Sequence, residues 1–207
     1  MAKSQDSNAP ESPSFLKRHI VPISLAIVVT FIGLFGSDVT LWLRFDRNAI
    51  LSGEIWRLFT GHLAHLTWSH LFMNLLGLVL VWALFNRNLS TKRWTQAILL
   101  CAFGISLFLL IIDSHLRWYV GLSGVLHGMF VVGCMFDLRR GRWDAKLLIV
   151  LIIAKLLYEQ LMGPLPGSVA TAGGGVVVDA HLFGAIMGYI TYRVFLRIDG
   201  PSTPFSN

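Results

Sequence analysis

The chain has 207 residues, of which 55% are hydrophobic and only 14% are charged, whereas about 25% of the residues of soluble domains are charged. This composition excludes an ordinary soluble domain and indicates a polytopic membrane protein with a single membrane domain. A net charge of +6 would suggest a nucleic-acid partner for a soluble chain. In a membrane protein it reports orientation, and we expect no nucleic-acid partner.

The apolar segments predict an all-α membrane domain with six transmembrane helices. Residues 1–18 are rich in Ser, Pro, Asn and charged residues, which predicts a disordered cytoplasmic tail. The membrane domain follows over residues 19–197, and residues 198–207 are predicted to form a second cytoplasmic tail. The predicted helices cover residues 20–35, 70–86, 95–112, 118–137, 145–162 and 178–196.

Lysine and arginine residues gather on one side of this arrangement. The positive-inside rule places that side and both termini in the cytoplasm. The cytoplasmic side carries Lys3, Lys17, Arg18, Arg87, Lys92, Arg93, Arg139, Arg140, Arg142, Lys146, Arg193 and Arg197, and the outer side carries Arg44, Arg47, Arg57 and Arg117. The fourth and sixth helices then run in the same direction, so Ser123 and His181 lie at one depth near the outer face.

Ser123 and His181 have the chemistry of a nucleophile and its base. A serine hydroxyl becomes a good nucleophile when a neighbouring neutral histidine takes its proton. No carboxylate is obviously placed as a third member, because Asp179 precedes His181 by two residues and points elsewhere on a helix. We therefore expect a dyad rather than a triad. The alternative is that both residues only pack between helices, and for either residue alone that alternative is the better one.

Glycines are spaced four residues apart in both helices, at Gly124 and Gly128 and again at Gly184 and Gly188. Such pairs let two helix backbones approach closely, although they are common in membrane bundles of every function. A short serine side chain needs such an approach to reach a neighbouring helix. The spacing therefore favours a contact between the fourth and sixth helices.

The first outer loop and the second helix carry an unusual number of polar residues. His70 and Asn74 lie four residues apart and share one face of the helix. Both can donate hydrogen bonds to a developing oxyanion, and one such donor contributes about 3 kcal/mol to lowering the barrier. They could instead join neighbouring helices. We interpret His62 and His65 as residues that hold the loop together.

The remaining polar groups are assigned structural roles, and no metal or cofactor is expected. The histidines lack an HExxH motif or a carboxylate or cysteine at zinc-ligand spacing. Lys155 and Glu159, four residues apart, are interpreted as a self-neutralised pair near the outer interface. Cys101 and Cys134 are predicted to be buried free thiols. A solvated loop is predicted for Asp113, His115 and Arg117.

Taken together, these patterns resemble the rhomboid family of intramembrane serine proteases. The resemblance rests on Trp-Arg at 56–57, HxxxN at 70–74, GxSG at 121–124 and AHxxGxxxG at 180–188. The four motifs occur in the order and topology of that family, and the similarity covers about residues 20–197. A six-helix rhomboid-like bundle is the fold that this resemblance implies.

The resemblance also implies a role for each matching residue. Ser123 would be the nucleophile and His181 the general base. The oxyanion hole would consist of His70, Asn74 and the backbone amide of Ser123. The structured first loop would contain Trp56, Arg57 and His65.

One departure points to a particular branch of the family. Rhomboids commonly carry a tyrosine one turn after the serine, where this chain has His127. The run from Gly121 to Gly128, together with Thr-Gly-His at 60–62 before His65, resembles the rhombosortases. His127, Gly121 and Gly124 are therefore candidates for active-site support. His127 could orient His181, shape the pocket or compete as the base.

The branch implies an enzyme of the bacterial inner membrane with its active site facing the periplasm. Its substrates would be exported proteins whose C-terminal GlyGly-type sorting tail contains a transmembrane helix. The alternatives are a general rhomboid protease with other single-pass substrates, a non-catalytic rhomboid-like binder of membrane segments and a small transporter, although a transporter would need paired intramembrane charges or inverted repeats. The sequence leaves open the oligomeric state and whether the acyl-enzyme is hydrolysed or transferred.

Overall fold

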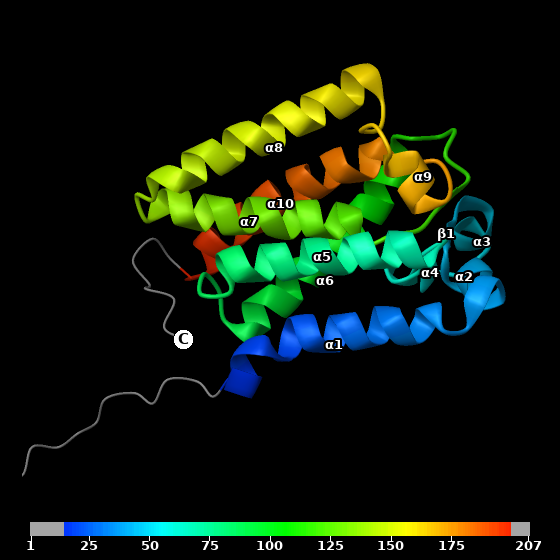
Figure 1. Ribbon diagram of the computed structural model, residues 1–207, viewed down its shortest axis with the longest axis horizontal. Coiled ribbons are helices and arrows are strands. Elements are labelled where there is room, and N and C mark those ends of the chain that lie inside the picture. Colours follow the sequence, from blue (N-terminus) through cyan, green and yellow to red (C-terminus); the bar gives the residue numbers. More distant parts are fainter. Residues whose placement is uncertain (1–14, 200–207) are drawn as a thin grey trace, which may run out of the picture.

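The structure is a computed structural model that describes residues 15–199 (Figure 1). Most of the predicted tails, 1–18 and 198–207, therefore lies outside the described residues. The helices are α1 (Phe15–Gly33), α2 (Gly36–Leu43), α3 (Arg47–Leu51), α4 (Arg57–Thr60), α5 (Trp68–Phe85), α6 (Thr91–Ile111), α7 (Ser123–Arg139), α8 (Trp143–Met162), α9 (Ser168–Ala172) and α10 (Val178–Asp199), and the strands are β1 (Phe45–Asp46) and β2 (Trp118–Tyr119).

Long helices lie at each of the six predicted apolar segments, namely α1, α5, α6, α7, α8 and α10. By length and composition, α5 and α6 can each cross a membrane, and the pair Arg18–Gly33 and Gly36–Leu43, bent by 118°, is a third candidate. The fold is thus predominantly helical, as expected, with one small strand pair that the all-α prediction did not include. The count of six spans stays a prediction.

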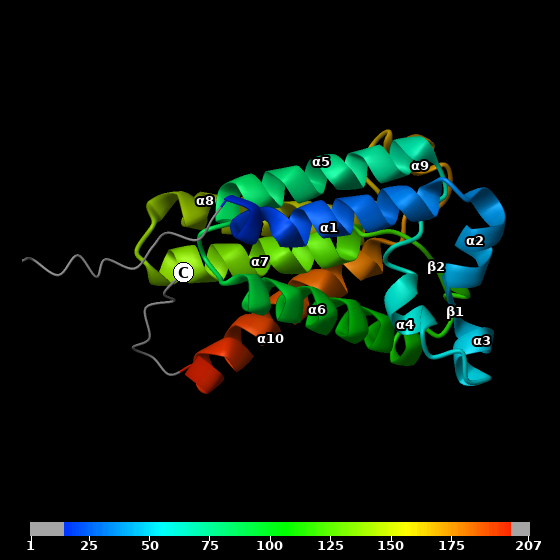
Figure 2. The ribbon, with the colours of Figure 1, turned by 90° about the horizontal axis from the view of Figure 1, so that it is seen from below.

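Successive long helices run in alternating directions (Figure 1). The α5–α6 and α7–α8 connections lie at the same end of the bundle as the two described ends of the chain. The short elements α2, α3, α4 and α9 and the strand pair lie at the opposite end, which we call the loop end (Figure 2). Helices α7 and α10 therefore both start at the loop end. Which end faces the cytoplasm stays a prediction from the charges.

Helix α7 lies at the centre of the bundle and packs against α5, α6, α8 and α10. Val125, Met129 and Val132 of α7 have no exposed surface, and Phe136 is nearly as buried. A helix that is apolar all round is expected in the interior of a fold. Residues at the start of α7 are therefore held by neighbours on several sides.

Glycines bring α7 and α10 into backbone contact, as their spacing predicted. A Cβ atom added at Gly124 would lie 2.7 Å from the carbonyl oxygen of Ala180, and one at Gly128 would lie 2.9 Å from that of Gly184. Added Cβ atoms at Gly184 and Gly188 would collide with the α7 backbone. A larger residue at any of these positions would push the two helices apart.

Apolar side chains cover the outer faces of the peripheral helices. Large residues there are between 58% and 80% exposed, such as Ile27, Phe31, Val79, Val150 and Leu161. A soluble monomer rarely exposes so much contiguous apolar surface. These faces match the surroundings of a protein that is integral to a membrane.

The fourth predicted helix starts later than expected. Residues Trp118–Tyr119 form β2, which pairs antiparallel with Phe45–Asp46 of β1. Gly121 then has a φ of +125°, a conformation that L-residues with a side chain rarely adopt. The helix therefore begins at Ser123 and not at residue 118, and the serine stands at the very start of α7.

The loop that contains Asp113, His115 and Arg117 is more ordered than predicted. His115 is exposed, but the backbone amide of Arg47 donates to the carbonyl oxygen of Arg117 at 2.9 Å. The guanidinium of Arg47 donates to four further carbonyl oxygens at 2.6–2.9 Å, those of Leu109, Leu110, Asp113 and Leu116. The Arg47 guanidinium thus joins two carbonyl groups of the last turn of α6, those of Leu109 and Leu110, to two carbonyl groups of the loop that follows.

Candidate active site

Ser123 and His181 meet where α7 and α10 begin. Ser123 is the first residue of α7, and His181 lies in the first turn of α10. The Oγ of Ser123 and the Nε2 of His181 are 2.9 Å apart, which is hydrogen-bond distance. The serine side chain can reach the histidine because the glycine contact holds the two helices close together.

A third residue, Glu159 of α8, joins this pair. Its Oε2 lies 2.9 Å from the Nδ1 of His181, and the Glu159 side chain is almost completely buried. The expectation that no carboxylate accompanies Ser123 and His181 is therefore wrong. The reason is that Glu159 comes from a different helix, on which sequence spacing to His181 carries no information.

The partners of His181 determine where its proton lies. A carboxylate only accepts hydrogen bonds, so the Nδ1 of His181 donates to Glu159. In the neutral ring this leaves the lone pair of Nε2 directed at the hydroxyl of Ser123, which donates to it. Histidine in this tautomer is ready to accept the serine proton.

Lys155 lies one turn before Glu159 on α8. Its Nζ is 2.7 Å from the same Oε2 atom that contacts His181. The predicted ion pair between Lys155 and Glu159 is thus confirmed. The prediction was incomplete, because the carboxylate is shared with the histidine and is not neutralised by the lysine alone.

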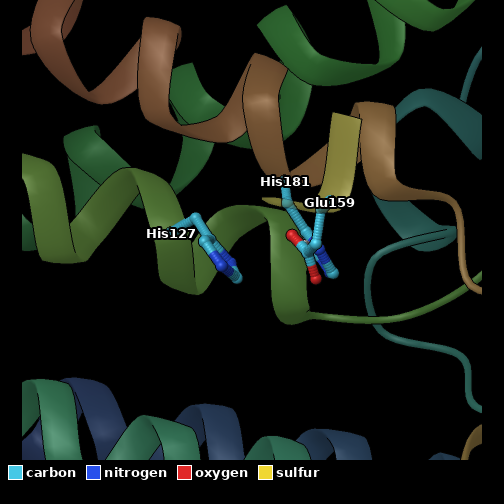
Figure 3. A group of neighbouring side chains, drawn as sticks. All are labelled: His127, Glu159 and His181. Atoms are coloured by element: carbon cyan, nitrogen blue, oxygen red, sulfur yellow. Dashed lines mark hydrogen bonds and ion pairs between the residues drawn. The ribbon is translucent and has the colours of Figure 1, made fainter. Parts of the chain in front are cut away.

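His127 lies flat against the ring of His181. The ring centroids are 4.4 Å apart and the ring planes are 16° apart. Figure 3 shows His127, Glu159 and His181 converging from α7, α8 and α10. The Nδ1 of His127 is 2.7 Å from the carbonyl oxygen of Ser123 and donates to it. This bond places the hydrogen of the neutral His127 ring on Nδ1. Because the Ser123 hydroxyl instead lies 2.9 Å from the Nε2 of His181, the geometry favours a packing role for His127 over that of a competing base.

His70 and Asn74 line the same cavity as Ser123. Thr67 caps α5 by accepting from the backbone amide of His70 at 3.1 Å. A Cβ atom at Gly121 would lie 2.9 Å from the His70 ring, so glycine lets that ring approach the start of α7. The Nδ2 of Asn74 donates to the carbonyl oxygen of His70 at 3.1 Å. The amide group has a second hydrogen, which is a donor for a ligand.

A cavity of about 560 Å³ adjoins these side chains at the loop end. Its polar and charged lining residues are His70, Asn74, Ser123, His127, Lys155, Glu159, Ser168, Thr171 and His181. Most of its wall is apolar and comes from α5, α7, α8 and the segment around α9. A largely apolar cavity with a few convergent polar groups is typical of a ligand-binding site.

The predicted loop residues Trp56 and Arg57 hold the loop end together. Arg57 is buried, and its Nε donates to the Oε2 of Glu54 at 2.6 Å. Its Nη1 donates to two backbone carbonyl oxygens at 3.0 and 2.9 Å. The Trp56 ring packs against that of Trp42, with 5.9 Å between the centroids. These contacts connect α2 to α4.

The two loop histidines are enclosed by protein. The Nε2 of His62 lies 2.9 Å from the carbonyl oxygen of Ala102 and 3.0 Å from the Oγ of Ser106, both in α6. The ring of His65 packs edge-on against that of His70, with 4.9 Å between the centroids. Burial lowers the pKa of His62 to about 4 and that of His65 to about 3, so both are neutral at pH 7. The structural interpretation of His62 is confirmed.

His127, Glu159 and His181 also belong to residue types that bind metal ions. One ligand atom from each lies within 4.8 Å of the others. A metal ion there would displace hydrogen bonds, because His181 uses one ring nitrogen for Ser123 and the other for Glu159. The absence of a metal from the mechanism stays a prediction.

Glu159 is the residue that sequence reasoning missed. A signal was present, since a carboxylate within an apolar segment is costly and marks function by default. Lys155 offered a sufficient local partner, and that explanation hid the second partner, His181. The contribution of α9 and the preceding loop to the cavity wall was also not predicted, because these residues carry no motif.

The fold and the site together define a class of protein, a helical membrane protein with a serine–histidine pair facing a cavity near one end of its bundle. Comparison with known protein families finds a match to the Rhomboid domain over residues 52–198. The chain therefore belongs to the rhomboid family, whose members are intramembrane serine proteases. The matched range contains every residue of the cavity's polar lining.

Proposed function

We propose that this protein is an intramembrane serine endopeptidase in which Ser123 is the nucleophile and His181 the general base. The observation that carries the proposal is the 2.9 Å approach of the Ser123 hydroxyl to the His181 Nε2 atom beside a cavity. Ser106 is an internal contrast, because its hydroxyl donates to the carbonyl oxygen of Leu58 at 2.7 Å, a structural bond.

The residues can perform acyl transfer in two stages. The Oγ of Ser123 attacks the peptide carbonyl carbon while its proton passes to the Nε2 of His181. When the tetrahedral intermediate collapses, the C–N bond breaks and His181 returns the proton to the leaving amine. Water then attacks the ester, giving a proton to His181, which restores the Ser123 hydroxyl. A nucleophile other than water would produce transfer in place of hydrolysis.

The oxyanion hole is proposed to consist of His70, Asn74 and the backbone amide of Ser123. The two side chains line the cavity beside Ser123. The Ser123 amide belongs to the first turn of α7, whose amides have no partner within the helix and carry the positive end of its dipole. Donors of this kind stabilise the negative charge that forms on the attacked carbonyl oxygen.

The proposed substrates are membrane-anchored proteins with a C-terminal transmembrane helix. Such a helix must unwind locally, because its peptide carbonyls are otherwise hydrogen-bonded and shielded. Glycines near the cleaved bond lower the cost of this opening. The similarity of residues 121–128, including His127, to the rhombosortases supports GlyGly-type sorting tails of exported proteins as the substrates.

The proposed location is the bacterial inner membrane, with both termini in the cytoplasm and the cavity facing the periplasm. The distribution of lysine and arginine along the sequence supports this orientation. Water is then available to the cavity from the periplasmic side. The bilayer and the substrate helix are the expected partners.

The test uses a fluorophosphonate probe, which phosphonylates an activated serine: an O–P bond forms, the P–F bond breaks, and fluoride and the serine proton leave. The full chain in detergent should be labelled, and Ser123→Ala should not. Ser114→Ala, which changes an exposed serine at the same end of the bundle, should label like the wild type. Absence of wild-type labelling under conditions that label a known serine hydrolase would contradict the proposal.

Substrate choice is tested in cells. The mature C-termini of exported proteins that end in a GlyGly-type tail are compared between cells producing the wild type and cells producing Ser123→Ala. Removal of the tail only with the wild type is expected. Intact tails in both, together with probe labelling of the purified enzyme, would indicate a rhomboid protease with other substrates. Tail binding without labelling would indicate a non-catalytic binder.

A further inference from the structure

Glu159 is a buried charged residue on a helix, α8, whose exposed surface is largely apolar. Helix α8 lies at the edge of the bundle, and much of its surface consists of exposed apolar side chains. Its buried residues are Ala145, Leu156 and Glu159. A carboxylate therefore occupies one of the few buried positions of α8, where an apolar side chain would not have to give up hydration free energy.

Burying this carboxylate requires strong partners, because a carboxylate that leaves water loses much of its hydration free energy. Glu159 has two, the Nζ of Lys155 at 2.7 Å and the Nδ1 of His181 at 2.9 Å. Both contact the same oxygen, Oε2. The histidine is thus an integral partner of the buried charge.

A purely local role for the pair on α8 does not account for this geometry. A lysine four residues away can neutralise a glutamate on any face of a helix, including one exposed to solvent. Here the carboxylate points inward, at the side of the His181 ring opposite to the side that contacts Ser123. The three groups form a continuous chain from Glu159 through His181 to Ser123.

We propose that Glu159 is a positioning residue that converts the serine–histidine pair into a Ser123–His181–Glu159 triad, with Lys155 keeping the carboxylate ionised. This inference rests on the proposed function. Glu159 holds the hydrogen of His181 on Nδ1, so that Nε2 is unprotonated and faces the serine. It then stabilises the imidazolium that forms when the serine proton arrives.

The proton balance requires no further reactant. During attack one proton moves from the Ser123 Oγ to the Nε2 of His181, and the Nδ1 proton stays on the ring beside Glu159. The carboxylate is not protonated at any step. When the leaving group takes the Nε2 proton, the neutral His181 tautomer of the resting state is restored.

Four charged or titratable side chains surround the His181 imidazolium. Glu159 favours it, whereas Lys155 on α8, His127 on α7 and His70 on α5 oppose it when they are positively charged. Glu159 is the single negative charge among these neighbours. Removing that charge while keeping the shape of the side chain should therefore make the imidazolium harder to form.

The experiment measures fluorophosphonate labelling rates of the full chain in detergent from pH 4 to pH 9, with a chelator present to remove metal ions. Glu159→Gln should lower the plateau rate by about 10²- to 10⁴-fold. It should also move the acid limb of the pH profile to lower pH. Glu159→Asp, which keeps the charge on a shorter side chain, should label faster than Glu159→Gln and keep its acid limb closer to that of the wild type.

The matched control is Asp144→Asn, which removes a carboxylate from the opposite end of the same helix, where it pairs with Arg142. It should label like the wild type. Lys155→Met is a second variant that leaves Glu159 in place, and its labelling should fall by less than that of Glu159→Gln. Thermal unfolding in detergent identifies any variant that has not folded.

The outcomes separate this inference from the proposed function. If the wild type is not labelled, the proposed function fails and the triad with it. If the wild type is labelled but Glu159→Gln labels at the same rate, the triad alone is overturned. A folded Glu159→Gln with a lower rate and an unmoved acid limb also overturns it, because packing damage changes the rate without changing the charge beside His181.

Discussion

Two buried histidines of this protein, His62 and His181, have similar burial but different partners. His62 is 1% exposed and His181 is 6% exposed. The imidazole of His62 contacts a backbone carbonyl and Ser106, whose own hydroxyl is committed to another carbonyl. The imidazole of His181 contacts a carboxylate on one side and a hydroxyl beside a cavity on the other.

Burial alone therefore does not distinguish a structural histidine from a reactive one. His62 joins the loop end to α6, and it is not among the residues that line the cavity beside Ser123. His181 has one nitrogen oriented by an acceptor and the other directed at a nucleophile. The two histidines should therefore respond differently to substitution, one through stability and the other through reactivity.

The largest expected effect is on reactivity at His181. His181→Gln should lower the fluorophosphonate labelling rate by about 10³-fold or more, because Ser123 loses the base that takes its proton. The protein should remain folded, as measured by thermal unfolding in detergent. His115→Gln, at an exposed position, is the control and should label normally. A His181→Gln variant that labels at the wild-type rate would exclude His181 as the base.

His62→Ala should act on stability. It removes a buried ring together with its bonds to α6, which should cost about 2–4 kcal/mol of the free energy of unfolding. The labelling rate per folded molecule should stay within a few-fold of the wild type. Unfolding by denaturant in mixed micelles, with His115→Ala as the control, measures the loss. Equal loss of labelling in folded His62→Ala and in His181→Gln would contradict the purely structural role of His62.

The free energy of unfolding should also depend on pH because of the buried loop histidine His62. The pKa of His62 is lowered by burial from 6.5 to about 4 in the folded protein, so the unfolded chain binds a proton that the folded chain does not. Above pH 6.5 His62 therefore does not lower the free energy of unfolding. As the pH falls from 6.5 towards 4, protonation of His62 in the unfolded chain lowers that free energy progressively. Between pH 7 and pH 5, His62 should account for a loss on the order of 1–2 kcal/mol.

The measurement is the free energy of unfolding at pH 7 and pH 5. His62→Gln should lose less stability between these two values than the wild type, because one of the groups responsible is gone. His115→Gln should retain the wild-type decline. An identical decline in His62→Gln would mean that the buried ring is protonated as readily in the folded state as in the unfolded state.

The smallest effect is expected at His127, which contacts both Ser123 and His181. His127→Tyr keeps an aromatic ring against His181 but loses the hydrogen bond to the Ser123 carbonyl, so labelling should fall by at most about tenfold. His127→Ala loses the stacked ring as well and should label more slowly than His127→Tyr. Unchanged labelling in both variants would remove any special role for His127.

Much of the fold could be predicted from local features of the sequence. Apolar segments located the six long helices, because removing backbone polar groups from water in a membrane requires helices. The glycine pairs predicted the contact between α7 and α10, since only residues without a Cβ allow that approach. The start of α7 could not be predicted, because the pairing of β2 with β1 connects residues far apart in sequence.

The candidate site was predicted in part. The motifs pointed to Ser123, His181, His70 and Asn74, which the structure brings to one cavity. Glu159 was missed as a partner of His181, although its charge was noticed. The direction in which a side chain leaves a helix depends on how that helix is rotated against its neighbours. Most positions of α8 are apolar, both exposed ones such as Leu157 and buried ones such as Leu156, so hydrophobicity does not fix this rotation.

Local features of the sequence were enough to predict the helical membrane character of the protein, the order of its long helices and the close approach of α7 to α10. These properties follow from hydrophobicity, charge and glycine spacing, which act over short stretches of chain. Which polar groups meet depends on how the helices pack against one another. Packing rotates α8 so that Glu159 faces His181 rather than lipid, and it places the ring of His127 on that of His181. Contacts between helices depend on three-dimensional packing, and no local pattern records them.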